Sequence, residues 1–207
     1  MIHVLPGMAA DHAMYPAAWQ ALPDSRFHDW PAHAGETSIA ALAGRVAEEA
    51  GIRDGDVVIG TSLGGIVACE LAKSRRLGGL FLVSSAIRKE EISGLLALLH
   101  PLAGLAPIEF IQRAAGKIPN ELTATFSRSD AAFIRATCRA IFEWEGLDAS
   151  RITPLRLHGQ WDPVIPLPAG VQRVLNGGHL IARTHAQECV DYILSSLPSE
   201  RTGATQP

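Results

Sequence analysis

The chain has 207 residues, of which 47% are hydrophobic, so one domain with one sizeable core is the default expectation. Net charge is −3 and the longest basic run is Arg75-Arg76, which argues against nucleic acid or an anionic membrane as a partner. No apolar run approaches bilayer-spanning length, and the chain starts with strand-like residues rather than a basic and apolar leader. Cys69, Cys138 and Cys189 are odd in number and widely spaced, which favours buried thiols. A cytoplasmic protein in a reducing compartment, without membrane association, is therefore expected.

Short apolar and β-branched runs alternate with helical patterns along the chain. Strands are predicted near residues 2–5, 26–30, 57–60, 79–83, 153–158 and 172–175. Helices are predicted over residues 39–50, 64–74 and 186–195. Ser38 is a suitable N-cap for the first helix, and Gly51 ends it. This alternation predicts an α/β fold with a mostly parallel sheet of about six strands and helices on both faces.

A long segment with its own helical patterns separates the strand that ends near Ser84 from the strand that begins near Thr153. Apolar residues recur through 90–102, and a second helix is predicted over 130–145 with Ser129 as its N-cap. The last residues, 198–207, are polar and are expected to form a flexible tail. Residues 1–197 then make a single domain.

The most informative motif is the run Gly-Thr-Ser-Leu-Gly-Gly at residues 60–65, which places one serine between small residues at a predicted strand-to-helix turn. A serine in such a turn has strained backbone geometry, and Gly60 and Gly64 remove the clashes that a neighbouring Cβ would cause. The pattern is G-x-S-x-G, and it predicts a nucleophile elbow in which the Ser62 hydroxyl projects from the sheet edge. The alternative is that Ser62 is only a small residue in a tight turn.

Two motifs downstream contain the partners that a serine nucleophile needs. Residues 155–166 are typical of a strand that runs into a loop carrying Asp162. Residues 174–180 are typical of a strand that ends in a Gly-Gly turn followed by His179. The chain order Ser, Asp, His is expected when each residue follows a successive strand of one sheet.

With these motifs the sequence resembles the α/β-hydrolase fold family. The matching pieces are Gly60-x-Ser62-x-Gly64, His158-Gly159-x-x-Asp162-x-x-Ile165-Pro166 and Gly178-His179. Residues 2–8 are similar to the first strand and oxyanion loop, with Leu-Pro-Gly where many relatives carry His-Gly. The resemblance covers nearly the whole chain apart from the middle segment and the tail. It implies an α/β-hydrolase fold in which residues 86–150 form a helical cap over the active site; the alternative is that these helices belong only to the core.

The stretch between Asp162 and His179 is short for this family and is interrupted by three prolines and Gly170. The helix that usually separates the last two strands is therefore expected to be abbreviated or absent.

The chemistry implied is acyl transfer. Ser62 would be the nucleophile, His179 the base that removes its proton, and Asp162 the carboxylate that holds the imidazole in the required tautomer. The backbone N–H groups of Met8 and Leu63 would bind the oxyanion.

Some of these roles have competitors in the sequence. Asp162 precedes a proline and could be only a turn residue. A carboxylate after the strand that ends near Ser84 is the alternative placement in this fold, which nominates Glu90 or Glu91. Of the seven other histidines, those at positions 3 and 158 lie in predicted strands and read as structural. Those at positions 12, 28, 33, 100 and 185 lack the Gly-Gly-His context.

The sequence lacks the motifs of metal-dependent, phosphate-binding and dinucleotide-binding proteins. The chain has neither H-E-x-x-H nor a cysteine cluster, no phosphate-binding Gly-Lys-Ser/Thr turn and no G-x-G-x-x-G after a strand, so no metal or cofactor is expected. An apolar pocket is expected from Met8, Met14, Leu95, Leu98, Phe142, Trp161, Val164 and Leu180, with Arg88 and Lys89 as candidates for holding an anionic group.

The sequence therefore predicts a serine hydrolase, a carboxylesterase or thioesterase with a small-molecule ester or thioester substrate. Two alternatives stay open: a hydrolase-like binding or receptor protein with little turnover, and a C–C hydrolase or lyase that uses the same triad.

Overall fold

The computed structural model describes residues 1–92 and 130–197 and contains a six-stranded sheet in which every strand pairing is parallel. The strands are β1 (Ile2–Leu5), β2 (Ser25–Phe27), β3 (Val57–Thr61), β4 (Gly79–Val83), β5 (Leu155–Gly159) and β6 (Arg173–Leu175). Their order in the sheet is β2-β1-β3-β4-β5-β6. The predicted α/β class and parallel sheet are confirmed, and each strand lies within a few residues of its expected position.

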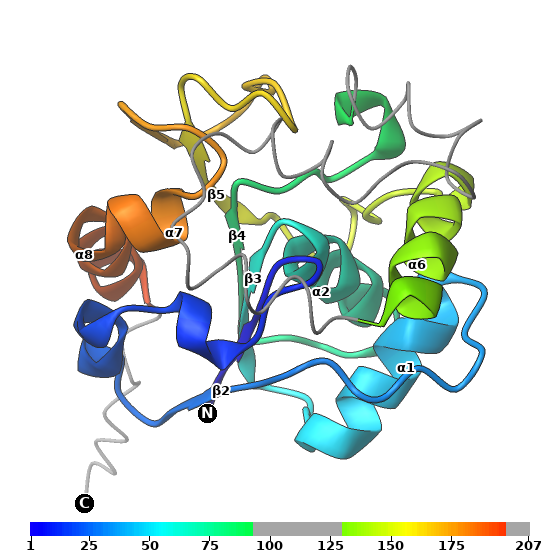
Figure 1. Ribbon diagram of the computed structural model, residues 1–207. Helices are drawn as coiled ribbons and strands as arrows, with labels where there is room; N and C mark the ends of the chain where they lie inside the picture. Colours follow the sequence, from blue (N-terminus) through cyan, green and yellow to red (C-terminus); the bar gives the residue numbers. More distant parts are fainter. Residues whose placement is uncertain (93–129, 198–207) are drawn as a thin grey trace, which may run out of the picture.

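Helices cover both faces of the sheet (Figure 1). Within residues 1–92 and 130–197, the α-helices are α1 (Ile39–Ala50), α2 (Leu63–Ser74), α6 (Ala131–Glu143), α7 (Ile181–Thr184) and α8 (Ala186–Ser196). The same residues contain the short 3-10 helices η1 (His12–Met14), η2 (Ala17–Ala21) and η3 (Lys89–Glu91). In Figure 1, α1, α2 and α6 lie on one side of the sheet, and α7 and α8 lie on the other.

The core is double because the central strands are buried on both faces. Val58, Leu80 and Leu82 point into the cluster formed with α1, α2 and α6. Their neighbours Ile59 and Phe81 point the opposite way, into the cluster formed with η2 and α8. Successive side chains of a strand face opposite sides, so a strand covered on both faces must be apolar almost throughout.

Both predicted ends of α1 are confirmed, whereas both predicted ends of α6 are wrong by one or two residues. The Ser38 hydroxyl accepts a hydrogen bond from the Ala41 N–H at 3.1 Å, and Gly51 ends α1 with a φ of 67°. The N-cap of α6 is Asp130 rather than Ser129, because the Asp130 carboxylate accepts from the Ala132 N–H at 2.7 Å. This helix also ends at Glu143, before the predicted end at residue 145.

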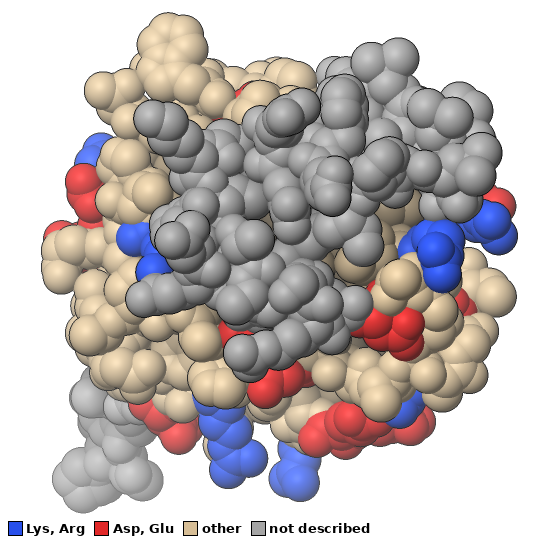
Figure 2. All heavy atoms as spheres, in the orientation of Figure 1, with Lys and Arg blue, Asp and Glu red and all other residues tan. Residues whose placement is uncertain are grey.

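The rest of the expected insertion is only partly visible. Residues 93–129, which contain most of the helix predicted over 90–102, lie outside the described residues, as does the tail over 198–207. No described helix combines the length and the apolar character that a bilayer span requires. On the face drawn in Figure 2, acidic and basic side chains of the described residues are interspersed along the lower margin.

The carboxyl ends of the strands meet at one edge of the sheet. Parallel pairing brings the turns after β1, β3, β4, β5 and β6 to this edge, which is where open α/β sheets place their sites. The candidate residues of the sequence all follow one of these strand ends, with Met8 after β1 and Ser62 after β3.

Candidate active site

Ser62 occupies a sharp turn between β3 and α2. It is a non-glycine residue with positive φ (φ 52°, ψ −116°), a conformation that costs about 1–3 kcal/mol and needs support from the surrounding structure. Its N–H donates to the Val83 carbonyl at 3.0 Å, and its own carbonyl accepts from the Ser85 hydroxyl at 2.7 Å. Hydrogen bonds from the end of β4 therefore hold both backbone groups of Ser62.

The flanking glycines are required sterically. A Cβ on Gly60 would overlap the backbone of Gly64, and a Cβ on Gly64 would lie 2.5 Å from the carbonyl oxygens of Leu5 and Pro6. The turn packs backbone against backbone on both sides, so larger residues would displace it.

Ser62, His179 and Asp162 form a continuous hydrogen-bonded chain. The His179 Nε2 lies 3.0 Å from the Ser62 Oγ, and the His179 Nδ1 lies 2.7 Å from the Asp162 Oδ2. An ionised carboxylate can only accept, so Nδ1 carries the proton and Nε2 presents a lone pair to the serine hydroxyl. This is the tautomer in which an imidazole can remove the proton of Ser62.

The Asp162 carboxylate is buried and held on both oxygens. Its Oδ1 accepts from the N–H groups of Val164 and Ile165, both at 2.9 Å, while Oδ2 faces His179 and also lies 3.2 Å from His158 Nε2. Burial by itself would raise the pKa of Asp162, but the hydrogen bonds from His158 and then His179 outweigh it and hold this pKa well below its usual range. Asp162 is thus a carboxylate at every working pH.

Glu91 and most of the competing histidines have partners outside the chain of Ser62, His179 and Asp162. Glu91 makes a two-pronged ion pair with Arg156, at 2.6 Å and 3.2 Å, and no described contact joins it to His179. Among the described histidines, His179 alone bonds to Ser62. His3 bonds to His28 and Asp56, His12 bonds to Asp29, and His185 bonds to Thr184. The His33 ring lies 2.9 Å from the Glu36 carboxylate, and His158 contacts Asp162. His100 lies outside the described residues.

The loop after β1 lies directly beside Ser62. A Cβ built on Gly7 would be 3.7 Å from the Ser62 Cβ. The Gly7 carbonyl accepts from the Trp30 indole N–H at 2.8 Å, and the Gly7 N–H points at the Met14 sulfur at 3.3 Å. Met8 follows Gly7 in this fixed loop, and Leu63 is the first residue of α2, where backbone N–H groups have no partner within the helix.

The described part of the insertion reaches this loop. In α6, Ile134 and Cys138 pack on Ala9 and the half-buried Met8, with the Cys138 sulfur 3.9 Å from the Met8 sulfur. At the other end of the insertion, the Arg88 guanidinium lies 3.7 Å from Glu91 and is mostly exposed.

The expected pocket residues divide. Met8 lies beside the site. Met14 is a buried core residue whose sulfur faces the Gly7 N–H, and the Trp161 side chain is 67% exposed. Leu95 and Leu98 lie outside the described residues. The helix expected to be short between β5 and β6 is absent from residues 163–172, in agreement with the proline-rich sequence.

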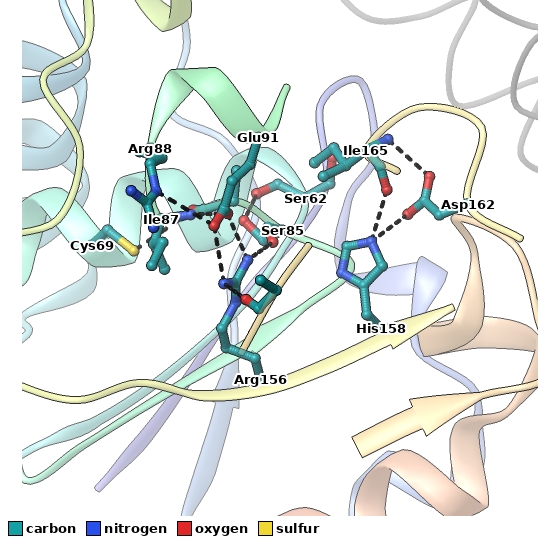
Figure 3. Close-up of polar contacts among 12 residues, drawn as sticks. Ser62, Cys69, Ser85, Ile87, Arg88, Glu91, Arg156, His158, Asp162 and Ile165 are labelled. Carbon is teal, nitrogen blue, oxygen red and sulfur yellow. Dashed lines mark hydrogen bonds and ion pairs between the residues drawn. The ribbon is translucent and has the colours of Figure 1, made fainter. Parts of the chain in front are cut away.

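Three polar residues at the site were not singled out from the sequence for what they contact. Ser85 bonds the Ser62 carbonyl, Arg156 donates to the Ser85 carbonyl at 3.2 Å, and His158 contacts Asp162 (Figure 3). For Ser85 and Arg156 the only sequence signal was a polar residue near the end of a largely apolar strand. His158 also belongs to the motif that contains Asp162, but its contact with that carboxylate was not predicted.

The three cysteines are free and buried in helices, as predicted. Burial raises the pKa of each thiol, to about 11 for Cys138 and to about 12 for Cys189, so none is a thiolate nucleophile near neutral pH. Among the described side chains, no group of three or more histidines, cysteines and carboxylates is arranged to hold a metal ion.

Comparisons with known proteins agree with this architecture. A profile described as "Alpha/beta hydrolase family" matches residues 4–192, and the chain therefore belongs to the α/β-hydrolase family. No curated protein sequence matches it at a significant level.

Solved structures resemble the chain in fold at low sequence identity. A hydrolase from Pseudomonas aeruginosa has a TM-score of 0.74 and 18% identity, covering 94% of this chain and 88% of its own. A thermophilic esterase from Thermogutta terrifontis has a TM-score of 0.70 and 19% identity, with the same coverage of 94% and 88%. The type II thioesterase BorB from the borrelidin biosynthetic cluster has a TM-score of 0.63 and 19% identity, covering 95% and 92%.

Proposed function

We propose that this chain is a serine hydrolase that cleaves a carboxylic ester or thioester through an acyl-enzyme on Ser62. The observation that carries the proposal is the unbroken chain of hydrogen bonds from Ser62 through His179 to the ionised Asp162. Such a chain supplies a nucleophile, a base in the correct tautomer and a fixed negative charge, which together are what acyl transfer requires.

In the first half of the reaction, the Ser62 oxygen attacks the acyl carbonyl while its proton moves to His179 Nε2. The carbonyl oxygen becomes an oxyanion, and the backbone N–H groups of Leu63 and Met8 would stabilise it. Asp162 stabilises the imidazolium that has formed. Collapse of the intermediate breaks the bond to the alcohol or thiol, which takes the proton from His179 and leaves the acyl group on Ser62.

In the second half, a water molecule gives one proton to His179 and attacks the acyl carbonyl. The second tetrahedral intermediate then expels Ser62, which recovers the proton from His179, and the carboxylic acid leaves. The sum is ester or thioester plus water giving acid plus alcohol or thiol, with no cofactor.

The surroundings of Ser62 favour an apolar acyl group of small to medium size. The described side chains beside the oxyanion loop are Met8, Ala9, Ile134 and Cys138, which present carbon and sulfur rather than charge. The segment over 86–150 would be the cap over this site, since its helix α6 packs on the loop. The esterase and thioesterase named among the similar structures fit the same substrate class.

The test is hydrolysis of p-nitrophenyl esters from acetate to decanoate, with a panel of acyl-CoA thioesters, by the wild type and Ser62→Ala. We expect turnover by the wild type that is lost in the variant, and the preferred chain length measures the acyl pocket. Equal turnover by both proteins would refute the assignment of Ser62. A folded wild type that is silent on both panels would favour a binding protein or a C–C hydrolase or lyase instead.

A further inference from the structure

His158, at the end of β5, is completely buried and makes contact with the proposed triad. Its Nε2 lies 2.8 Å from the Ile165 carbonyl oxygen and 3.2 Å from the Asp162 Oδ2. Both of these atoms are acceptors, so Nε2 must carry a proton and donate it. Figure 3 shows the ring directed toward Asp162 and Ile165 together.

The Asp162 carboxylate has N–H groups against both of its oxygens. Its Oδ1 accepts two backbone N–H groups, from Val164 and Ile165, and its Oδ2 accepts the Nδ1–H of His179. The His158 Nε2, whose proton also faces the Ile165 carbonyl, lies 3.2 Å from the same Oδ2. An ionised carboxylate has about four lone-pair sites; here three accept N–H groups and the fourth faces the N–H that His158 shares between Asp162 and Ile165. His158 also bonds the carbonyl of Ile165, whose N–H bonds Asp162, so one ring ties the carboxylate to its own loop.

We propose that His158 is a positioning residue that fixes the Asp162 carboxylate and shares its negative charge with His179. The inference rests on the proposed function, since it assigns His158 a role in the same site. Without His158, Oδ2 would have one donor instead of two, and more of its charge would act on the His179 ring. The stronger negative charge beside His179 would stabilise its protonated ring, so a higher pH would be needed for His179 to act as a base.

The other charged groups near this pair do not offer the same effect. The Arg156 side chain lies two residues before His158 on the same side of β5, but its guanidinium is paired with Glu91. Within the described residues, the titratable groups that contact Asp162 are His158 from β5 and His179 from the turn after β6. On the far side of the His179 ring, Nε2 faces the Ser62 hydroxyl, which is uncharged.

Two variants separate the effect of the His158 N–H donor from the effect of the space that its ring fills. His158→Leu removes the N–H and fills much of the space, whereas His158→Gln keeps an amide N–H that can reach the position of Nε2. For His158→Leu we expect the acid limb of the kcat/KM profile to move up by about one pH unit, because a hydrogen bond to a charged group is lost. For His158→Gln we expect a limb close to that of the wild type.

A matched control is His3→Leu. His3 is also a buried strand histidine, with 1% exposure, but its partners are His28 and Asp56 at the start of the sheet rather than the site. This variant should lower the thermal stability and leave the acid limb in place. An acid limb that also stays in place in His158→Leu, or that moves equally in His158→Gln, would show that His158 only fills space.

A second measurement needs neither a variant nor a substrate. Ring ¹H–¹⁵N correlations of the wild type should show His158 with the proton on Nε2; a proton on Nδ1 alone would overturn the proposal. Absence of ester turnover and of fluorophosphonate labelling at Ser62 would refute the proposed function, and the tautomer of His158 would then decide its positioning role separately.

Discussion

Asp162→Asn is the substitution whose consequence can be worked out most fully from the structure. The Asp162 Oδ1 accepts two backbone N–H groups, so the asparagine oxygen must take that position. Its NH₂ group then lies where Oδ2 was, facing the N–H of His179 and the N–H of His158. Donors would meet donors, and His179 would relieve the conflict by moving its proton from Nδ1 to Nε2.

With that change, the nitrogen that faces Ser62 carries a hydrogen and cannot accept one. We expect kcat for p-nitrophenyl acetate to fall by about 10³- to 10⁴-fold, equivalent to about 4–5.5 kcal/mol of transition-state stabilisation. The assay is steady-state hydrolysis at neutral pH, with Ser62→Ala as the control for background hydrolysis and circular dichroism to confirm that each variant is folded. Retention of more than a tenth of the wild-type kcat would refute the tautomer argument.

Glu91→Gln is the matched control because Glu91 is the alternative carboxylate for the triad. Its partner Arg156 is 3% exposed, and removing one member of a buried pair costs about 3–5 kcal/mol. The amide still accepts one hydrogen bond, so the lower end of this range is expected, measured as a reduced free energy of unfolding. Its kcat should stay within a few-fold of the wild type. A loss of kcat as large as that of Asp162→Asn would indicate that Glu91, not Asp162, is the carboxylate of the triad.

The remaining predictions concern the elbow and the surface. Ser85→Ala removes the hydrogen bond to the Ser62 carbonyl and should lower both kcat and the free energy of unfolding, the latter by about 1 kcal/mol. Ser84→Ala should lower neither, because the buried Ser84 hydroxyl has no hydrogen-bond partner in the described structure. Equal effects of the two substitutions would contradict the role of Ser85. Gly60→Ala should cost at least about 1–3 kcal/mol in thermal unfolding, because its Cβ would overlap the Gly64 backbone, and an unchanged Tm would contradict this. Burial opposes ionisation of Glu36, but its hydrogen bond to Arg45 lowers the pKa to about 2 from an ordinary value near 4.5. The stability it contributes is therefore present above pH 4.5 and lost as the pH falls toward 2, so Glu36→Gln should lower the Tm at pH 7 but not at pH 2, and an equal loss at both pH values would refute the linkage.

The fold could be predicted from the sequence because its signals are local. Runs of β-branched residues mark strands buried on both faces, and Ser38 with Gly51 marks both ends of α1. The elbow was predictable because the G-x-S-x-G pattern is local, and a Cβ on Gly60 would overlap the backbone of Gly64 only four residues away. The close approach of Gly64 to Leu5 and Pro6 joins distant segments and is known only from the structure.

The support around the triad could not be predicted, because it depends on contacts between distant segments. His158 reads as one more strand residue until β5 is placed against the 162–165 loop. The buried charge of Arg156 could not be explained from the sequence, because its partner Glu91 lies 65 residues earlier in the chain and the pairing is known only from the structure. Ser129 and Asp130 are equally good N-caps by residue type, and only the geometry of α6 selects Asp130.

The most direct test of the central claim is rapid-quench mass spectrometry during turnover of a p-nitrophenyl ester. We expect an acyl group on the peptide that contains Ser62, formed during a burst of p-nitrophenol release before steady-state hydrolysis and absent in Ser62→Ala. Continued turnover with the acyl group on another residue, or with no acyl-enzyme and no loss in Ser62→Ala, would contradict this claim.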